Sequence, residues 1–348
     1  MAEAIPPSAS PALADGLAHV ELVVEMHAQW ESTTLKFMAG RIAVGIDHPD
    51  WPQQQAARLA GIRRDLDRTV RRLVDLAGPE IEGMIEEAYR RGHGAPPAPE
   101  RRPGLVRRVL DAMRGLWNRL TGNATRAYQR AVTAGTHAPA GERRQAVQRE
   151  LNRTADRGLT VDRDARGRAQ ALVPRVQTAL QTAAGNAAMD GYLDRLTAEG
   201  EDLVRVTRSP HPCPVCRPWE DRILSVIVST RYPSIGTARA AGLWHPRCRH
   251  TIEHYRPGMP RHPHAVEHKP GTYDQEQRQR AIERHIRTWK RREAAALDDV
   301  ERALARRKVR QWEAALRAHL AATGLQRSRM RERIEFGHSR PLKHALGG

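Results

Sequence analysis

The residues best suited to chemistry are three cysteines and two histidines between positions 213 and 250. Cys213 and Cys216 form a Cys-x2-Cys pair, and His245, Cys248 and His250 follow; the chain has no other cysteine. Thiolates and imidazoles bind Zn²⁺ tetrahedrally, and a Cys-x2-Cys turn presents two sulfurs from one knuckle. The second cluster offers three candidates for two remaining positions. The sequence therefore predicts one structural zinc ion held by the three cysteines and by either His245 or His250.

A catalytic zinc centre is the alternative interpretation. With an open coordination position, His245 or His250 could act as a base beside the cation, as in a nuclease-like enzyme on nucleic acid. The nearest carboxylates, Glu220 and Asp221, are interpreted as hairpin-turn residues. Zinc deaminases pair Pro-Cys-x-x-Cys with His-x-Glu, but here that triplet lies far upstream, at residues 19–21. We therefore predict a closed structural site, no enzymatic activity and no small-molecule substrate.

Short strands must position these ligands. The segment DLVRVTRS is rich in β-branched residues and predicts one strand, and RILSVIVST predicts its partner after the CPVC turn. Trp219 and Trp244 flank the ligands and are expected to cover the zinc and its hairpin as a small core. The change from a helical spacing of apolar residues to short runs of β-branched residues predicts a zinc-binding β-hairpin module over residues 201–258.

The rest of the chain is predicted to be helical, because apolar residues recur at spacings of three and four. The expected fold is mostly α: helical bundles or hairpins, the small zinc-stapled β-hairpin module, and a C-terminal α-hairpin. Gly78-Pro79 is expected to interrupt one helix, and DRGLTVDRDARGRAQ to form a turn. The other predicted regions are a disordered lead (1–16), an N-terminal helical hairpin or bundle (17–100), a central helical region (101–200), a linker (259–274), the C-terminal α-hairpin (275–335) and a disordered tail (336–348).

Composition limits the possible functions. The formal net charge is +18, carried almost entirely by arginine, and aromatic residues make up only 4% of the chain. Such a charge suits a polyanionic partner such as DNA, although GC-rich coding alone would also favour arginine. No apolar run is long enough to span a membrane, and the N-terminus lacks the pattern of a signal peptide. An odd number of cysteines without an export signal favours metal ligands over disulfides.

Two segments around the cysteines, CPVCRPWEDRILSV and AGLWHPRCRHTIEHYRPG, resemble phage minor capsid proteins of the MuF-like head-morphogenesis group. The resemblance is in particular to the members found in actinobacterial phages and prophages. It extends in the same order to IDHPDWPQQQAARLAGIRRDLDR, DRGLTVDRDARGR, DLVRVTRS and TYDQEQRQRAIERHIRTWKRREAAAL. Most of the chain is therefore similar to this family, and residues 205–258 carry the most specific part.

The resemblance carries implications for the site. Many relatives have glycine where Asp221 follows the Trp-acidic pair, but Asp tolerates positive φ better than most residues, so the turn is expected to survive. Trp219 corresponds to the aromatic residue of the family hairpin. The positions that match the family's zinc-site residues are Cys213, Cys216, His245, Cys248 and His250.

The resemblance also implies a role in the virion. It implies a structural component of the portal vertex or inner head, located in the host cytoplasm during assembly. The expected partners are the portal protein and other capsid proteins, with non-specific contact to packaged DNA and none to a membrane.

Overall fold

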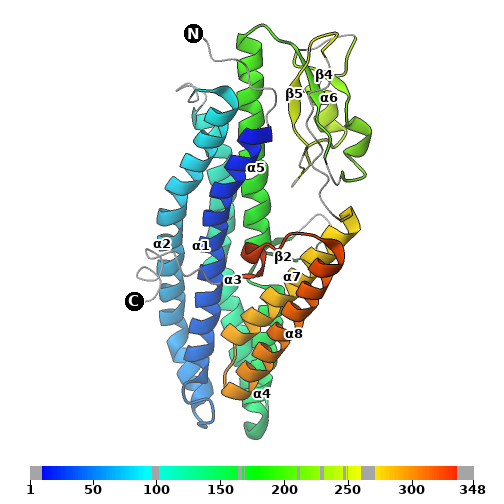
Figure 1. Cartoon of the computed structure of the whole chain (residues 1–348). Coiled ribbons are helices and arrows are strands. Elements are labelled where there is room, and N and C mark those ends of the chain that lie inside the picture. The colour runs from blue at the N-terminus through cyan, green and yellow to red at the C-terminus, as the bar shows by residue number, and fades with distance from the viewer. Residues whose placement is uncertain are drawn as a thin grey trace. The chain divides into compact units, whose positions relative to one another are not determined.

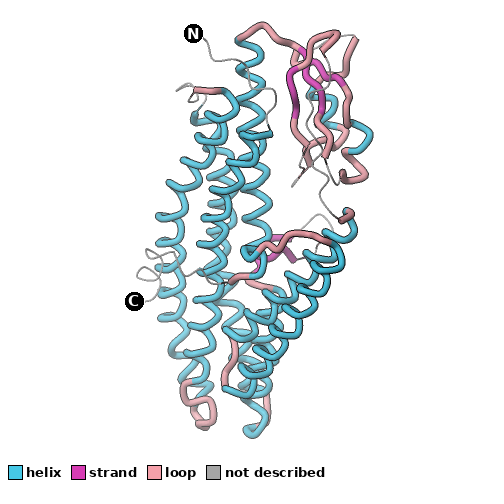
Figure 2. The backbone as a smooth tube through the Cα atoms, viewed as in Figure 1, coloured by secondary structure: helices cyan, strands magenta, loops and turns pink. Residues whose placement is uncertain are grey.

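The computed structural model describes residues 10–95, 102–163, 167, 169–209, 212–227, 231–245, 248, 250–259 and 271–334. Within these ranges the chain is mostly helical, with two small antiparallel sheets (Figures 1 and 2). The predicted mostly α fold with a small β module is confirmed. None of the described helices carries an apolar stretch long enough to cross a bilayer.

Eight α-helices cover most of the described residues. In chain order they are α1 (Ser10–Ala43), α2 (Trp51–His93), α3 (Arg102–His137), α4 (Arg143–Arg157), α5 (Leu172–Ala198), α6 (Ile235–Ala240), α7 (Tyr273–Ala294) and α8 (Asp299–Thr323). Residues 10–16, expected in a disordered lead, belong to α1; Pro11 suits the first turn of a helix because its missing N–H has no partner there. The predicted tail, 336–348, lies outside the described residues, as do positions 260–270 of the predicted linker.

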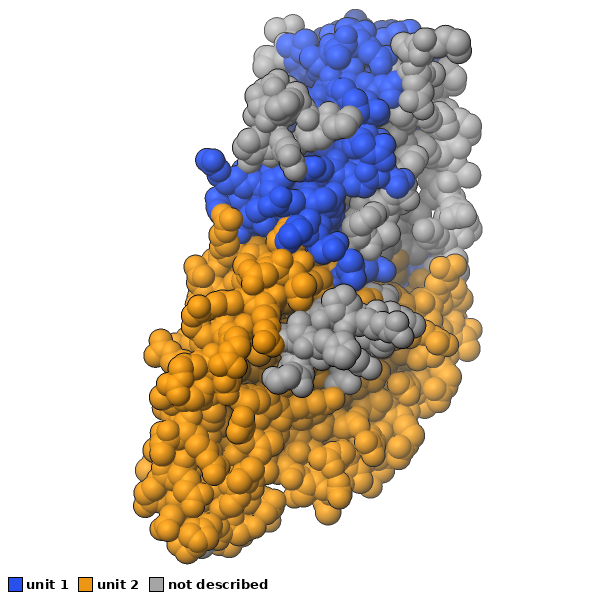
Figure 3. Space-filling view, turned by 90° about the vertical axis from the view of Figure 1, so that its left-hand side faces the viewer, with its two compact units in different colours: residues 1–22, 79–111, 177–275 blue, residues 23–78, 112–176, 276–348 orange. Residues whose placement is uncertain are grey.

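Contacts between residues divide the chain into two compact units, each made of several segments and shown in its own colour in Figure 3. Unit 1 comprises residues 1–22, 79–111 and 177–275, and unit 2 comprises residues 23–78, 112–176 and 276–348. The chain passes between the units inside α1, α2, α3, α5 and α7. The consecutive regions proposed from the sequence stay predictions.

Helix α2 runs through Gly78-Pro79, where the sequence predicted a break. Proline removes one backbone hydrogen bond and crowds the preceding turn, at a cost of about 3 kcal/mol in a helix interior. Gly78 has no Cβ, which relieves part of the clash with the proline ring. Leu73, Ala77 and Ile81 are fully buried on either side. Their burial on both sides of Pro79 outweighs the local cost and keeps the helix continuous.

Unit 1 contains the three-stranded sheet that holds the site. Strand β3 (Leu203–Val206) lies between β4 (Ile223–Ser225) and β5 (Ile252–His254), and both pairings are antiparallel. The predicted pairing of the first two strands is confirmed, although β4 covers only three residues of RILSVIVST. Strand β5 and helix α6 were not predicted. Val204, Leu224 and Ile252 from the three strands are fully buried against Tyr192 and Leu196 of α5.

In unit 2, buried polar contacts close the connection between α1 and α2. Trp51 Nε1 donates to the carbonyl of Ile42 at 2.9 Å, and Arg143 of α4 donates to the carbonyls of Ile46 and His48 at 3.0 and 2.7 Å. Where the sequence predicted a turn, β1 (Thr160–Arg163) and β2 (Ala169–Ala171) instead pair as a short antiparallel ladder. Two strands this short leave too little periodicity to be recognised from sequence.

The predicted C-terminal α-hairpin is confirmed in unit 2. The rings of His285 in α7 and Trp312 in α8 stack with centroids 4.1 Å apart, and Ile282, Ile286 and Leu316 form a buried cluster beside them. The Asp298 side chain accepts a hydrogen bond from the backbone N–H of Glu301 at 2.9 Å and so caps α8. Gly324 ends α8 in the left-handed conformation.

Candidate metal centre

The first ligand turn lies between β3 and β4. The backbone N–H groups of Cys216 and Arg217 donate to the carbonyl of Cys213 at 3.2 and 3.0 Å, and a 3₁₀-helix, Arg217–Trp219, follows. The Cys216 N–H also lies 3.4 Å from Cys213 Sγ. Backbone donors of this kind stabilise a thiolate, because they place positive dipoles beside the sulfur. The turn therefore presents both sulfurs from one knuckle, as the spacing predicted.

The second ligand turn lies between α6 and β5. Trp244 has a φ of 59°, in the left-handed region, which turns the chain sharply after α6. The Cys248 N–H donates to the carbonyl of His245 at 2.8 Å. The His250 N–H lies 3.4 Å from Cys248 Sγ, so this turn also supplies a backbone donor to one of its sulfurs.

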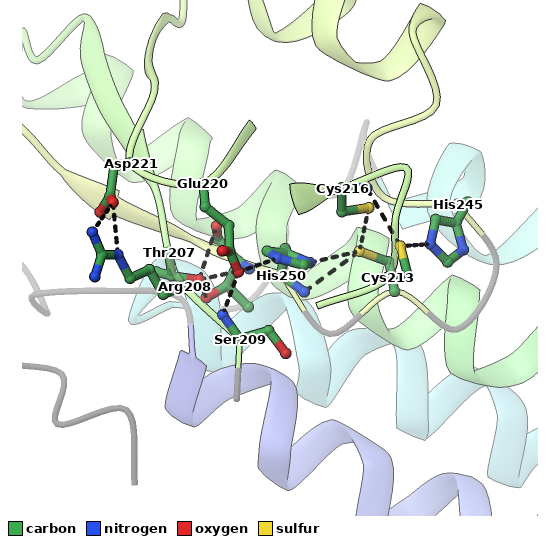
Figure 4. Close-up of polar contacts among 11 residues, drawn as sticks. Thr207, Arg208, Ser209, Cys213, Cys216, Glu220, Asp221, His245 and His250 are labelled. Carbon is green, nitrogen blue, oxygen red and sulfur yellow. Dashed lines mark hydrogen bonds and ion pairs between the residues drawn. The ribbon is translucent and has the colours of Figure 1, made fainter. Parts of the chain in front are cut away.

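The structure brings all five predicted residues together (Figure 4). Cys213 Sγ lies 2.9 Å from His245 Nε2, Cys216 Sγ lies 3.5 Å from Cys248 Sγ, and Cys248 Sγ lies 3.5 Å from His250 Nδ1. The donor atoms form two triples, Cys213–Cys216–His245 and Cys216–Cys248–His250, and within each triple all atoms lie within 4.8 Å of one another. Each triple could hold a metal ion, and Cys216 belongs to both.

A carboxylate that was not predicted as part of the site fixes His250. The His250 side chain is almost fully buried, and its Nε2 lies 2.9 Å from Glu220 Oε1. An ionised carboxylate only accepts hydrogen bonds, so Nε2 is the donor in this contact; in a neutral ring the lone pair then lies on Nδ1, 3.5 Å from Cys248 Sγ. The same Glu220 oxygen accepts from the Ser209 N–H at 2.8 Å. A carboxylate in this position is the usual device for orienting a histidine ligand.

Glu220 reaches His250 because of the turn that follows it. Asp221 has a φ of 63°, in the left-handed region, so the turn accommodates Asp as expected. Its backbone N–H donates to the carbonyl of Val206 at 3.0 Å, and Arg208 Nε donates to its Oδ2 at 2.6 Å. These contacts hold the turn against the end of β3. The only sequence signal for Glu220 was a carboxylate close to the cysteine pair.

The three thiols have different electrostatic environments. Burial raises the pKa of Cys216, and the neighbouring thiols of Cys248 and Cys213 raise it further. Burial also raises the pKa of Cys248. Burial opposes ionisation of Cys213, but hydrogen bonds with His245 and the Cys216 backbone outweigh it and lower its pKa. A bound divalent cation would favour the thiolates at all three positions, so metal binding is expected to release protons.

Both tryptophans singled out from the sequence pack against the core of the module. Trp219 and Trp244 are partly buried and pack, like Cys213 and Cys248, against the core of the sheet, so they contribute to the small core predicted for the hairpin; cover of a bound ion stays a prediction. The guanidinium groups of Arg222 and Arg239 lie over the two indole rings, at 5.6 and 5.7 Å from the centroids.

Other contacts attach the module to α5. The Tyr192 hydroxyl accepts from the His254 N–H at 3.0 Å, and His254 Nε2 lies 2.8 Å from a Glu201 carboxylate oxygen. His254 is thus engaged away from the donor cluster, whereas His211 lies outside the described residues.

The fold and the site define a mostly helical protein with one compact Cys/His module. A family model described as phage minor capsid protein 2 matches residues 17–321. The chain therefore belongs to the phage minor capsid protein 2 family, and its resemblance to phage minor capsid proteins is confirmed. This membership supports a structural protein of the virion. No curated protein and no solved structure gives a significant match to the chain.

Proposed function

We propose that the chain is a non-enzymatic structural component of the phage head, associated with the portal vertex and inner shell during assembly. The family match over residues 17–321 carries this proposal. The portal protein and other capsid proteins would be its partners, in the host cytoplasm during assembly and afterwards in the virion. Long helices with a small rigid module suit docking on a multi-subunit ring, since separate helical faces can contact separate subunits.

We further propose that the module binds one structural zinc ion. Three thiols and one imidazole form a Cys3His set, which typically gives a closed tetrahedral site. When bound, the ion would cross-link the two ligand turns. His250 is the better fourth ligand, because it is nearly fully buried and oriented by Glu220. His245 Nε2 then serves as a donor to the Cys213 sulfur, 2.9 Å away.

Histidine substitutions test this assignment. His250→Gln is expected to weaken zinc affinity by more than 100-fold, because a ligand is lost. His245→Gln and Glu220→Gln are expected to weaken it roughly 10- to 100-fold, the usual effect of losing a group that supports a ligand. Affinity is measured by competition with a chromophoric chelator. Cobalt substitution supplies a second readout, since the ligand-field spectrum should change in His250→Gln and persist in His245→Gln. The opposite order of effects would assign His245 as the ligand.

Head assembly tests the functional proposal. The tagged chain, produced during phage growth, is expected to co-sediment with purified heads and to cross-link to the portal protein. Its absence from purified heads would overturn the proposal. The purified, zinc-loaded chain is expected to leave DNA intact. DNA cleavage that His250→Ala abolishes while zinc content is retained would instead support the nuclease-like alternative.

A further inference from the structure

A short segment of α5, residues 188–196, contacts two neighbours: α2, and the module of β3, β4, α6 and β5 that carries the metal centre. The residues involved all belong to unit 1. Tyr192 lies in the middle of the segment and is fully buried. Its side chain packs against the module, whereas its backbone packs against α2. A displacement of Tyr192 therefore affects both neighbours.

The Tyr192 side chain shares a buried core with both ligand turns. It belongs to the same cluster as Cys216, the candidate ligand that is common to both donor triples. Leu243, which directly precedes the second ligand turn, belongs to this cluster too. The Tyr192 hydroxyl also accepts the backbone N–H of His254 in β5 at 3.0 Å. The position of α5 and the positions of the two ligand turns are therefore linked.

The backbone of the same segment packs against α2 without room for a side chain between them. A Cβ added at Gly191 would lie 2.3 Å from the carbonyl oxygen of Tyr89 in α2. A Cβ added at Gly92 of α2 would lie 2.9 Å from the backbone nitrogen of Tyr192. The Tyr89 hydroxyl also donates to Asp194 Oδ2 at 2.6 Å. Surfaces packed this closely transmit displacements, so α2 must adjust when α5 moves.

We propose that metal binding in the module and the packing of α2 against α5 are coupled through residues 188–196. The inference rests on the proposed zinc site, because the ion is what joins the two ligand turns. The module is the element with two states, since small structural zinc modules fold as the metal binds. Folding of the module fixes Tyr192, and Tyr192 fixes α5 against α2. Metal occupancy thus controls helix packing outside the module.

Hydrogen exchange on the full-length chain measures how the metal affects the helices. Removal of zinc with a chelator is expected to speed amide exchange in residues 86–93 of α2 roughly tenfold, because local opening there becomes easier. Residues 309–316 of α8 are the internal control and should change by less than about twofold. Tyr192→Phe keeps the ring but removes the acceptor for the His254 N–H. In that variant, zinc removal should change exchange in residues 86–93 by less than about threefold.

Zinc affinity measures the reverse effect, because coupling between two sites is reciprocal. Gly191→Ala is expected to weaken zinc binding roughly tenfold, since separation of α2 and α5 displaces Tyr192 from the module. Tyr89→Phe is a milder variant that keeps the ring and removes the hydrogen bond to Asp194, and it should weaken zinc binding roughly threefold. The matched control is Gly83→Ala, where an added Cβ meets no atom within 4 Å. Its zinc affinity should stay within about twofold of the unmodified chain.

Three outcomes would overturn the coupling. The first is equal exchange in residues 86–93 with and without zinc, and the second is unchanged zinc affinity in both Gly191→Ala and Tyr89→Phe. The third is acceleration in residues 309–316 as large as that in α2, which would show that the whole chain opens as one. Elemental analysis separates the two proposals. A chain that holds one zinc ion but fails these tests keeps its zinc site, whereas a chain without zinc loses both the site and the coupling.

Discussion

Replacing Cys216 by serine is expected to abolish metal binding and to unfold the module formed by β3, β4, α6 and β5. Cys216 is fully buried, and its sulfur belongs to both donor triples. Serine supplies no thiolate, and structural zinc sites contribute about 10–16 kcal/mol of apparent binding free energy to folding at neutral pH. Strands of three or four residues cannot replace that contribution through their own core.

Elemental analysis should find about one zinc ion per unmodified chain and less than about 0.1 in Cys216→Ser. Limited proteolysis should then cleave within residues 201–258, and the variant should be missing from purified heads. His254→Gln is the control, because His254 belongs to β5 but pairs with Glu201 instead of the donor cluster. Full zinc content in Cys216→Ser would show that the ion is bound elsewhere.

Gly191→Ala is expected to destabilise unit 1 by about 3 kcal/mol, which is the upper end of the usual cost of adding a methyl group to a closely packed site. A Cβ at Gly191 of α5 would lie 2.3 Å from the carbonyl oxygen of Tyr89 in α2. On the facing helix, a Cβ at Gly92 would lie 2.1 Å from the carbonyl oxygen of Ala188. Because both obstacles are backbone atoms, α2 and α5 can accept a methyl group only by moving apart.

Urea denaturation monitored by circular dichroism measures the loss. The control is Gly83→Ala, also in α2, where an added Cβ meets no atom within 4 Å. Alanine there should stabilise the helix by about 0.5–1 kcal/mol, since glycine is the poorer helix former. A free energy of unfolding for Gly191→Ala within about 0.5 kcal/mol of the unmodified chain would contradict the close helix packing.

Much of the helical architecture could be predicted from the sequence. The long helices and the α7–α8 pair leave repeating apolar positions, which are readable without tertiary information. Strand β5 and helix α6 cover only three and six residues, and the pairing of β5 with β3 joins positions about fifty residues apart. The break predicted at Pro79 was wrong for the opposite reason. Proline is a strong local signal for the end of a helix, but the burial of apolar side chains on both sides of it keeps α2 continuous.

The candidate ligands could be predicted because cysteine is rare in this chain and its spacing is specific. The contact of Glu220 with His250 could not be predicted, because it depends on the left-handed turn at Asp221 and on the pairing of β3 with β5. The proposed choice of His250 over His245 rests on the burial of His250 and on the Glu220 carboxylate beside its ring. Neither feature leaves a trace in the spacing of the sequence.

Every passage of the chain between the two compact units falls inside a helix: α1, α2, α3, α5 or α7. No inter-unit tether exists at which the described chain could be divided, so truncation at any of these points would leave broken helices with exposed apolar stripes. Neither unit corresponds to one continuous segment that could be expressed by itself. Dissection of this protein therefore calls for point variants of the intact polypeptide, with fusion tags confined to its ends.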